Sequence, residues 1–470
     1  MLQKNTKIVA TISDKNCSVE FLKKLYEAGM NVVRINTAHQ STKDSLRVIK
    51  NVKKVSEKIP ILLDTKGPEI RTKKFEKEIF VKKGEIINVY SCDDFLDNGK
   101  KSFGVSYKNF VKDLNVGNHI LIDDGETDLL VIDKNEKYLS CKVENDGIIK
   151  SKKSINVPNV IIDLPSLSPK DMDFLKFAIE NDIDFIAHSF VRNKNDILNI
   201  QKILDINNSK IKIIAKIENQ EGVDNIDEIL EHAYGIMVAR GDLGIEISAE
   251  KIPSIQKFLK EKCFNKRKPV VIATQMLHTM INNPRPTRAE VSDVANAIYD
   301  RVDAIMLSGE TAYGKYPIES VETMSKIAIE IEKKRRYFKK PLEMVIRNKT
   351  SSFLAECAVD ASIKLDTKAI IADSISGTTI RNLVAYRSTK PIYAMCYSKS
   401  LMRELAIFYG VIGNYMTERE TTEHFSSESH KILMKNKKFN KKDLIVVLAG
   451  NFGKKQGASF IEICFIEDLI

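Results

Sequence analysis

The stretch that decides the fold is KIIAKIENQEGVDNIDEILEHAYGIMVARGD, residues 212–242, which contains two short runs rich in β-branched and small apolar residues. The first run, residues 212–218, ends at Glu218, and the second, residues 235–242, ends at Asp242. Continuous apolar runs of this length are typical of parallel strands that are buried on both faces. A charged residue at the end of each run indicates that the strand ends carry chemistry.

Short apolar runs of the same kind recur along the rest of the chain. Eight such runs occur, and helical stretches such as residues 19–28, 170–180 and 250–264 lie between them. The runs begin near residues 8, 31, 61, 185, 212, 235, 269 and 304. This alternation predicts an α/β fold, a closed (β/α)8 TIM barrel formed by residues 1–67 and 164–333. Thr287 and Glu290 have the spacing of a capping box, which predicts that a helix begins there and runs to Tyr299.

Two other parts of the chain have different patterns. In residues 68–163, apolar residues alternate with period two, and turn residues such as Lys83-Gly84 and Asp124-Gly125 separate the segments. These features predict a small β-barrel domain, inserted after the third barrel strand as a lid. In residues 334–470, strands alternate with helices again, which predicts a C-terminal α/β domain with a regulatory role.

Composition limits the possible partners. The formal charge of +11 suits an anionic ligand, but a lysine-rich solvated surface is the favoured explanation. Trp is absent and the basic clusters lack interleaved aromatic residues, so we expect no nucleic-acid partner. No run reaches the ~18 apolar residues that a membrane span needs, and the start of the chain lacks a signal-peptide core. We therefore expect a cytoplasmic protein without a membrane partner.

Polar side chains gather at the carboxyl ends of the expected barrel strands, where barrel enzymes place their active sites. They are Arg34, Asn36, Asp64, Thr65, Lys66, Ser189, Arg192, Lys216, Glu218, Arg240, Asp242, Thr274, Ser308 and Glu310. Acids and bases mixed at one end of a barrel are not expected of an ordinary core, so this set indicates an active site.

Glu218 and Asp242 end two adjacent strands of this set. Two carboxylates can hold a hard cation such as Mg2+ and leave positions for substrate oxygens and water. Lys216 lies on the same strand face as Glu218 and is suited to stabilising a phosphoryl or enolate oxygen. We expect residues 241–244 to form a tight turn whose backbone N–H groups receive a carboxylate or phosphate.

Several long motifs resemble the pyruvate kinase family, and together they extend over nearly the whole chain. They are KIVAT (residues 7–11), LDTKGPEIRT (63–72), AKIEN (215–219), MVARGDLGIE (237–246), ATQML (273–277), PRPTRAE (284–290), SDVANA (292–297) and IMLSGETA (305–312). The resemblance implies transfer of the phosphoryl group of phosphoenolpyruvate to ADP, which yields pyruvate and ATP. It also implies Mg2+ (or Mn2+) and K+ as cofactors, and a homotetramer.

The resemblance implies roles for individual residues as well. Lys216 would stabilise the transition state and Arg34 would bind the transferring phosphate. Glu218 and Asp242 would hold Mg2+. The substrate carboxylate would be received by Gly241, Asp242 and Thr274. For protonation of the enolate, our own candidate path is Thr274 with a water relay through Ser308 and Glu310. K+ would be bound by Asn36, Asp64 and Thr65. The nucleotide would be contacted by Asn36, Thr37, Ala38, His39, Arg71 and Lys153.

A Ser/Thr-rich segment in the C-terminal domain has two interpretations. It contains Ser374, Ser376, Gly377, Thr378 and Thr379. Hydroxyls and a glycine at a helix start form a good phosphate cradle, and in many pyruvate kinases this position binds a sugar-phosphate effector. An ordinary helix-capping loop explains the segment equally well, because Thr378 stands where an arginine is more usual.

The chain departs from the family pattern in three places. Ser13-Asp14 replaces a Gly-Pro near the nucleotide, and Tyr313 replaces a lysine. Ala38 replaces a serine whose hydroxyl would bind K+, although Glu69 is the residue typical of K+-dependent members. These changes leave the nucleotide preference and the strength of the K+ requirement open.

Two other functions share part of this pattern. A metal-dependent barrel aldolase acting on pyruvate or phosphoenolpyruvate shares the carboxylate pair but does not explain the inserted β domain. A non-catalytic regulatory relative would explain the departures but not the intact Lys216, Glu218, Asp242 and Thr274. Residues 309–315 have the spacing of a P-loop, but Tyr316 stands where a Mg2+-binding Ser or Thr is required.

Overall fold

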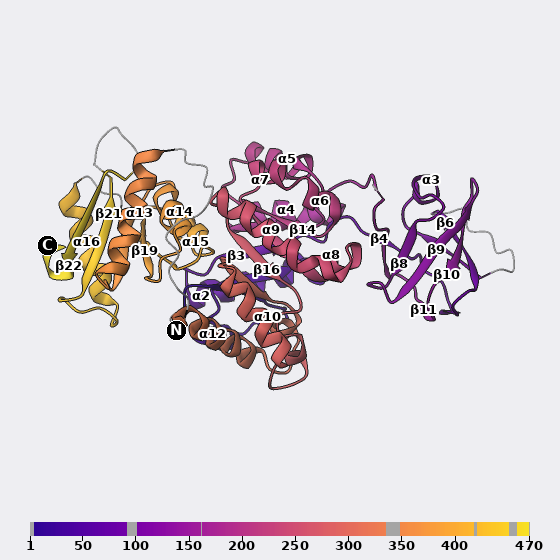
Figure 1. Cartoon of the computed structure of the whole chain (residues 1–470), viewed down its shortest axis with the longest axis horizontal. Coiled ribbons are helices and arrows are strands. Elements are labelled where there is room, and N and C mark those ends of the chain that lie inside the picture. The colour runs from indigo at the N-terminus through magenta and orange to yellow at the C-terminus, as the bar shows by residue number, and fades with distance from the viewer. Residues whose placement is uncertain are drawn as a thin grey trace.

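The computed structural model describes residues 4–91, 101–160, 162–334, 348–417, 421–450 and 458–469. Along its longest axis the barrel lies in the middle, the inserted β domain at one end and the C-terminal α/β domain at the other (Figure 1). The expected junction near residue 334 adjoins residues 335–347, which lie outside the described residues. Within the described residues, no helix is long and apolar enough to cross a membrane.

The predicted barrel is confirmed, since eight parallel strands close on themselves. Their order around the barrel is β1-β17-β16-β15-β14-β13-β3-β2. The strands are β1 (Lys7–Thr11), β2 (Val32–Asn36), β3 (Ile61–Asp64), β13 (Phe185–His188), β14 (Lys212–Ile217), β15 (Gly235–Ala239), β16 (Val270–Ala273) and β17 (Ala304–Leu307). Because β3 pairs with β13, the barrel closes across the inserted β domain.

Both faces of the barrel strands are buried, and the residues of the two faces belong to two separate apolar clusters. On β14, Ile213, Ala215 and Ile217 pack against the surrounding helices, whereas Ile214 belongs to the cluster inside the barrel. Lys216 is two residues after Ile214, so its side chain points to the inside of the barrel as well, because side chains alternate between the two faces of a strand. The barrel interior is therefore apolar over most of its length and charged at the carboxyl ends of its strands.

Helices surround the barrel, and several begin where the sequence predicts. They are α1 (Val19–Ala28), α2 (Thr42–Val55), α4 (Pro169–Glu180), α5 (Lys194–Ile206), α6 (Gln220–Asp224), α7 (Ile226–His232), α8 (Arg240–Glu246), α9 (Ile252–Asn265), α10 (Arg288–Tyr299), α11 (Gly309–Ala312) and α12 (Pro317–Lys334). The capping box predicted at Thr287 and Glu290 is confirmed, with both reciprocal hydrogen bonds formed, and α10 ends at Tyr299.

The inserted β domain is built almost entirely of strands. It comprises β4 (Ile70–Arg71), β5 (Ile79–Val81), β6 (Ile86–Ser91), β7 (Ser102–Val105), β8 (His119–Ile122), β9 (Thr127–Lys134), β10 (Tyr138–Val143), β11 (Gly147–Ile149), β12 (Ser154–Asn156) and the short helix α3 (Phe110–Asp113). Seven strands form one sheet in the order β4-β12-β8-β9-β10-β6-β7. A bridge between Thr72 and Val105 joins its two edges, which gives the rolled, barrel-like form that the sequence predicts.

The C-terminal domain contains a five-stranded sheet in the order β20-β19-β18-β21-β22. Its elements are α13 (Lys349–Lys364), β18 (Ala369–Ser374), α14 (Thr378–Ala385), β19 (Ile392–Cys396), α15 (Lys399–Leu405), β20 (Val411–Tyr415), α16 (Thr422–Lys435), β21 (Leu444–Ala449) and β22 (Phe460–Phe465). One apolar cluster includes both residues inside the barrel, such as Met237, and residues of this domain, such as Phe408. The C-terminal domain therefore closes the base of the barrel.

A buried ion pair joins these two domains. Arg387 of the C-terminal domain contacts Asp303, which precedes β17, through both terminal nitrogens, with Nη2–Oδ2 at 2.9 Å. Asp303 also accepts hydrogen bonds from the backbone N–H groups of Val270 and Tyr409. The side chains of Arg387 and Asp303 are 4% and 1% exposed. Removing one partner would leave a buried charge without compensation.

We expect Arg387→Leu to lower the free energy of unfolding by about 3–5 kcal/mol, the cost of an unpaired buried charge. The exposed pair of Lys390 and Asp366 in the same domain provides a control. Lys390→Leu should cost less than about 1 kcal/mol. Urea unfolding of the full chain, followed at the first transition, measures both. Equal shifts in the two variants would contradict the assigned role of the Arg387–Asp303 pair.

Candidate active site

Lys216 lies at the centre of the charged end of the barrel. Its Nζ lies 2.7 Å from Ser189 Oγ, 3.0 Å from Asp64 Oδ1 and 3.0 Å from Glu218 Oε1. Burial alone would lower the pKa of Lys216, but Asp64, Glu218 and Asp242 raise it above its ordinary value. The lysine is therefore charged at neutral pH, and three acceptors fix the position of its ammonium group.

Asp64 connects Lys216 to the second cation of the site. Its Oδ2 accepts a hydrogen bond from Arg34 Nε at 2.6 Å, while its Oδ1 contacts Lys216. Burial favours a higher pKa for Asp64, but the two cations hold the pKa below its usual value. Arg34 Nη1 also donates to Thr11 Oγ1 at 2.9 Å. Arg34 and Lys216, which the sequence placed at different strand ends, are thus brought together by one carboxylate.

Glu218 and Asp242 form the candidate divalent-metal site. Glu218 is almost fully buried and accepts a hydrogen bond from the backbone N–H of Phe190 at 2.7 Å. Burial and the nearby Asp242 carboxylate raise the pKa of Glu218, against the opposing effect of Lys216. A cation between two such carboxylates would relieve their repulsion, so the donor set fits Mg2+. Among the described residues no group of three or more His, Cys, Asp and Glu side chains could hold a metal, so the remaining ligands would be substrate oxygens and water.

The segment from residue 241 to residue 244 differs from the sequence prediction. It is not a tight turn but part of α8, which begins at Arg240 directly after β15. The backbone N–H of Gly241, expected to be free for a ligand, donates to Thr274 Oγ1 at 2.7 Å. The structure nevertheless brings Gly241 and Thr274 together, as a shared carboxylate site requires. Thr274 has a φ of 67°, a left-handed conformation that turns the chain sharply after β16.

Ser308 and Glu310 lie together after β17. Glu310 is buried, and its carboxylate accepts hydrogen bonds from the backbone N–H groups of Ser308 at 2.8 Å and Leu277 at 3.2 Å. Among the described residues, no hydrogen bond joins Thr274 to either of them. The water relay expected between Thr274 and these two residues stays a prediction.

The three K+ candidates lie on β2 and at the end of β3. Asn36 Oδ1 accepts a hydrogen bond from the backbone N–H of Ala38 at 3.1 Å. The backbone oxygen of Thr65 accepts one from Ser189 Oγ at 2.7 Å, and both carboxylate oxygens of Asp64 contact cations. Lys170 Nζ donates to the backbone oxygen of Ala38 at 3.0 Å, so one positive charge already lies beside this segment.

Of the nucleotide candidates, Arg71 and Lys153 but not residues 36–39 line a cavity between the β domain and the barrel. Its volume is about 580 Å3, and Arg71, Lys153 and Asp242 contribute to its lining. Arg71 contacts Glu69 at 2.6 Å, and Lys153 contacts Asp123 at 2.7 Å. Both cations are thus paired within the β domain. Thr37 is fully buried and donates to the backbone oxygen of Asp64, so its side chain does not face a ligand here.

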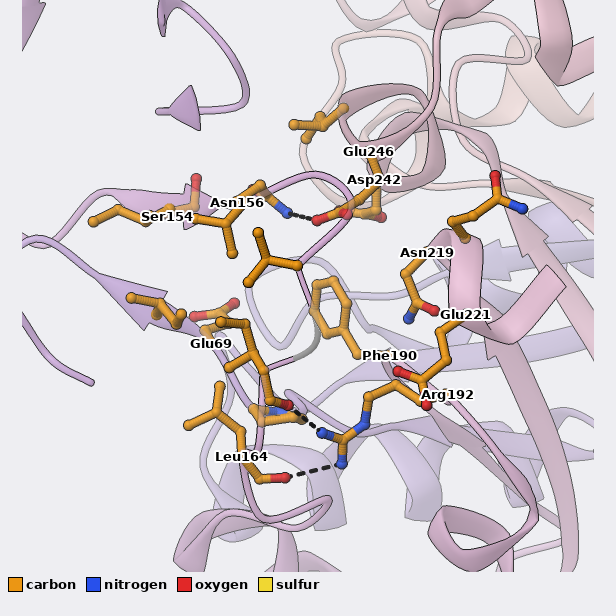
Figure 2. A pocket seen from close by; sticks show the side chains of 18 of the residues that line it. Glu69, Ser154, Asn156, Leu164, Phe190, Arg192, Asn219, Glu221, Asp242 and Glu246 are labelled. Carbon is orange, nitrogen blue, oxygen red and sulfur yellow. Dashed lines mark hydrogen bonds between the residues drawn. The ribbon is translucent and has the colours of Figure 1, made fainter. Parts of the chain in front are cut away.

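Figure 2 shows how the β domain meets the barrel across this cavity. Asn156 at the end of β12 donates its side-chain amide to Glu246 Oε1 of α8 at 3.1 Å. Glu246 lies in the same helix as Asp242, and burial raises the pKa of Glu246. Arg192 donates to Asp196 and to the backbone oxygens of Ile162 and Leu164, so it supports the connection between the domains.

The departures near the nucleotide region have local explanations. Asp14 Oδ2 lies 3.3 Å from Arg47 of α2, so its negative charge is partly balanced. Ser13 Oγ donates to the backbone oxygen of Ala312 at 2.7 Å and ties the loop after β1 to α11. Tyr313 is 74% exposed, so it occupies the surface instead of filling a binding site.

The Ser/Thr-rich segment forms the turn between β18 and α14. Ser374 Oγ accepts a hydrogen bond from the backbone N–H of Gly377, whose φ is 80°. The hydroxyls of Ser376 and Thr378 lie 3.0 Å apart. These two residues also contribute to the lining of a cavity of about 1010 Å3 at the base of the barrel, together with Lys210. Thr379 lies in the first turn of α14.

Sequence reasoning missed several contacts that shape the site. Thr11, on an apolar strand, gave no signal that its hydroxyl would contact Arg34. Ser189 was noted only as a strand-end residue. Phe190 contributes through its backbone, whose φ is 54°, and no residue pattern indicates this. Arg240 pairs with Asp293 through both terminal nitrogens and donates to the backbone oxygen of Thr274. The sequence contains one indication of these contacts, namely that Arg240 directly follows an expected strand.

A buried set of paired charges at the carboxyl ends of the strands of a (β/α)8 barrel, beside a cavity that Asp242 helps to line beneath the β domain, is typical of a barrel enzyme. Comparison with known proteins makes this specific. The family model described as "Pyruvate kinase, barrel domain" matches residues 3–321, and the model described as "Pyruvate kinase, alpha/beta domain" matches residues 352–464. The chain belongs to the pyruvate kinase family, a family of phosphotransferases.

Relatives match over the full length of the chain. A pyruvate kinase of Borreliella burgdorferi is 48% identical over 476 residues, covering 100% of this chain and 99% of the relative. A pyruvate kinase of Bacillus licheniformis is 42% identical and one of Staphylococcus epidermidis is 41% identical. Each of these alignments covers 99% of this chain and 81% of the relative.

Proposed function

We propose that the barrel site transfers the phosphoryl group of phosphoenolpyruvate to ADP and yields pyruvate and ATP. The full-length relationship to pyruvate kinases supports this activity. The observation that carries the proposal is the position of Lys216, buried between Asp64 and Glu218 and linked through Asp64 to Arg34. No finding favours the aldolase or the non-catalytic relative.

Phosphoryl transfer requires mainly positioning and positive charge around the transferred group. Arg34 binds the phosphoryl oxygens, and Lys216 directs an N–H to the charge that develops in the transition state. Glu218 and Asp242 would hold Mg2+ (or Mn2+), which neutralises charge on the phosphoryl and enolate oxygens when bound. The barrel walls exclude water around these groups, so each electrostatic contact is stronger than it would be in solvent.

The substrate carboxylate binds where Gly241 and Thr274 meet. The Gly241 N–H now donates to Thr274 Oγ1, and a carboxylate would take the place of that acceptor. Thr274 then lies beside the enolate carbon that receives a proton. Ser308 and Glu310 have no direct contact with Thr274 among the described residues, so their role depends on bridging water.

The β domain supplies the nucleotide contacts. Arg71 and Lys153 line the cavity above Asp242, and their present partners are Glu69 and Asp123. A polyphosphate entering the cavity would compete with these carboxylates for the two cations. Asn36 and His39 would contact the nucleotide from the barrel side, and Asn36, Asp64 and Thr65 would supply oxygens for K+.

The regulatory role of the C-terminal domain and the homotetrameric assembly stay predictions that rest on the family resemblance. We propose a phosphorylated sugar as effector at the turn of Ser374, Ser376, Gly377, Thr378 and Thr379. The hydroxyls of Ser376 and Thr378, which line the same cavity as Lys210, support an anionic ligand there. A homotetramer and a cytoplasmic location complete the proposal.

The direct test is a coupled assay for pyruvate. The purified chain should release pyruvate from phosphoenolpyruvate only when ADP and Mg2+ are both present, because the metal and the acceptor complete the site. Chelation of the metal should abolish the reaction, and added Mg2+ should restore it. Pyruvate formation without ADP would point to a lyase or phosphatase instead, and a complete lack of reaction would favour the non-catalytic relative.

We expect Lys216→Met to lower kcat by roughly 10^2–10^3, the usual cost of removing one preorganised donor to the transition state. Met keeps much of the length and the apolar contacts of the lysine stem, so circular dichroism and the unfolding midpoint serve as controls for folding. Lys212→Met, on the same strand but at its opposite end, is a matched substitution that should leave kcat unchanged. Near-normal turnover in Lys216→Met would remove the lysine from the mechanism.

K+ should activate the enzyme, and Ala38→Ser should lower the K+ concentration needed for half-activation by about fivefold. The added hydroxyl would provide one more oxygen ligand, a contact worth on the order of 1 kcal/mol. Initial rates over a K+ series at constant ionic strength, with Na+ as the replacement ion, measure this. Activity that is independent of K+ would contradict the proposed site. An unchanged half-activating concentration would show that residue 38 does not contact the ion.

A further inference from the structure

Ser189 is the one neutral group among the three acceptors that contact Lys216. It directly follows β13, and its side chain is buried. Lys216 Nζ donates to Ser189 Oγ at 2.7 Å, which is the shortest of the three contacts. A lysine ammonium group has three N–H donors, so all three are engaged when Ser189, Asp64 and Glu218 accept them.

The hydroxyl proton of Ser189 is committed elsewhere. Ser189 Oγ donates to the backbone oxygen of Thr65 at 2.7 Å, so the lone pairs of the hydroxyl are left for Lys216. The backbone N–H of Ser189 also donates to Thr65 Oγ1 at 3.0 Å. A second acceptor, Asp64 Oδ1, lies 3.4 Å from Ser189 Oγ, so the backbone oxygen of Thr65 at 2.7 Å is the closer of the two acceptors of the hydroxyl proton.

The surrounding backbone is shaped to hold Ser189 in this place. Gly67 has a φ of 73°, and a Cβ added there would lie 2.7 Å from the Cβ of Ser189. The next residue, Phe190, has a φ of 54° and donates its N–H to Glu218. Two neighbouring residues at the end of β13 therefore orient both Lys216 and Glu218.

The three acceptors of Lys216 are not equivalent during a reaction. Asp64 is also bound to Arg34, and Glu218 is a proposed metal ligand, so an N–H now directed at Glu218 becomes available for a substrate oxygen. Ser189 has neither of these other partners. It can keep its contact with Lys216 throughout and carries no charge that would oppose transfer of a phosphoryl group.

We propose that Ser189 is a positioning residue of the phosphotransfer site, which holds the ammonium group of Lys216 in line with the transferred phosphoryl by anchoring it to the backbone of Thr65. The inference rests on the proposed role of Lys216. It also connects Lys216 to a candidate K+ ligand through a single hydroxyl.

The test is Ser189→Ala in the full chain. Losing a hydrogen bond to a charged donor should lower kcat and kcat/KM for phosphoenolpyruvate by the same factor of about ten, with KM unchanged. The matched control is Ser325→Ala on α12, because Ser325 is equally buried and its hydroxyl donates to the backbone oxygen of Ala28 at 2.8 Å. The control should alter stability but not kcat.

A double-mutant cycle shows whether Ser189 acts through Lys216. In a Lys216→Met background, Ser189→Ala should lower the residual rate by less than about twofold, because the contact is already lost. The inference is overturned if Ser189→Ala leaves kcat unchanged, if it raises KM alone, or if its full effect persists without Lys216. Normal turnover of Lys216→Met alone would instead overturn the proposed role of the lysine itself.

Discussion

The site depends on the neutralisation of four buried charges by one another. Arg34 and Lys216 are separated by Asp64, which contacts both, and Glu218 contacts Lys216 from the other side. Any one of these charges alone would be costly inside a barrel. Together their formal charges balance, although burial and the nearby Asp242 still raise the pKa of Glu218. The set is therefore ready to receive an anionic substrate and a divalent cation, which bring charges of opposite sign.

This arrangement follows from the alternation of side chains along parallel strands. Apolar residues such as Ile214 and Met237 fill the inside of the barrel, and the C-terminal domain closes its base. At the open end the same inward series carries charged groups, such as Lys216 two residues after Ile214. The interior thus provides a rigid, water-excluding floor beneath the reactive groups, while Phe190 and Gly67 adopt left-handed backbone conformations that fit the strand ends around them.

Sequence reasoning identified the strands, the capping box at Thr287 and the residues at the strand ends, because each depends on local periodicity or spacing. It could not give the contact between Asp64 and Lys216. That contact depends on β13 lying between β3 and β14, a spatial order set by pairing across the inserted domain. The prediction of a tight turn after β15 was wrong because a helix can begin directly at a strand end when its first residue, here Arg240, is held by Asp293.

The placement of the β domain within the barrel sequence has a consequence for the order of folding. β3 and β13 are neighbours in the barrel, yet residues 65–184 separate them in the chain, and joining such distant segments is entropically costly. Pairing of β4 with β12 at the root of the β domain, where Ile70 lies opposite Ile155, brings the two ends of the insertion together. Once that domain has formed, the flexible chain between β3 and β13 is much shorter than it is in the unfolded protein. Formation of the β domain before the barrel would therefore lower the entropic cost of pairing β3 with β13.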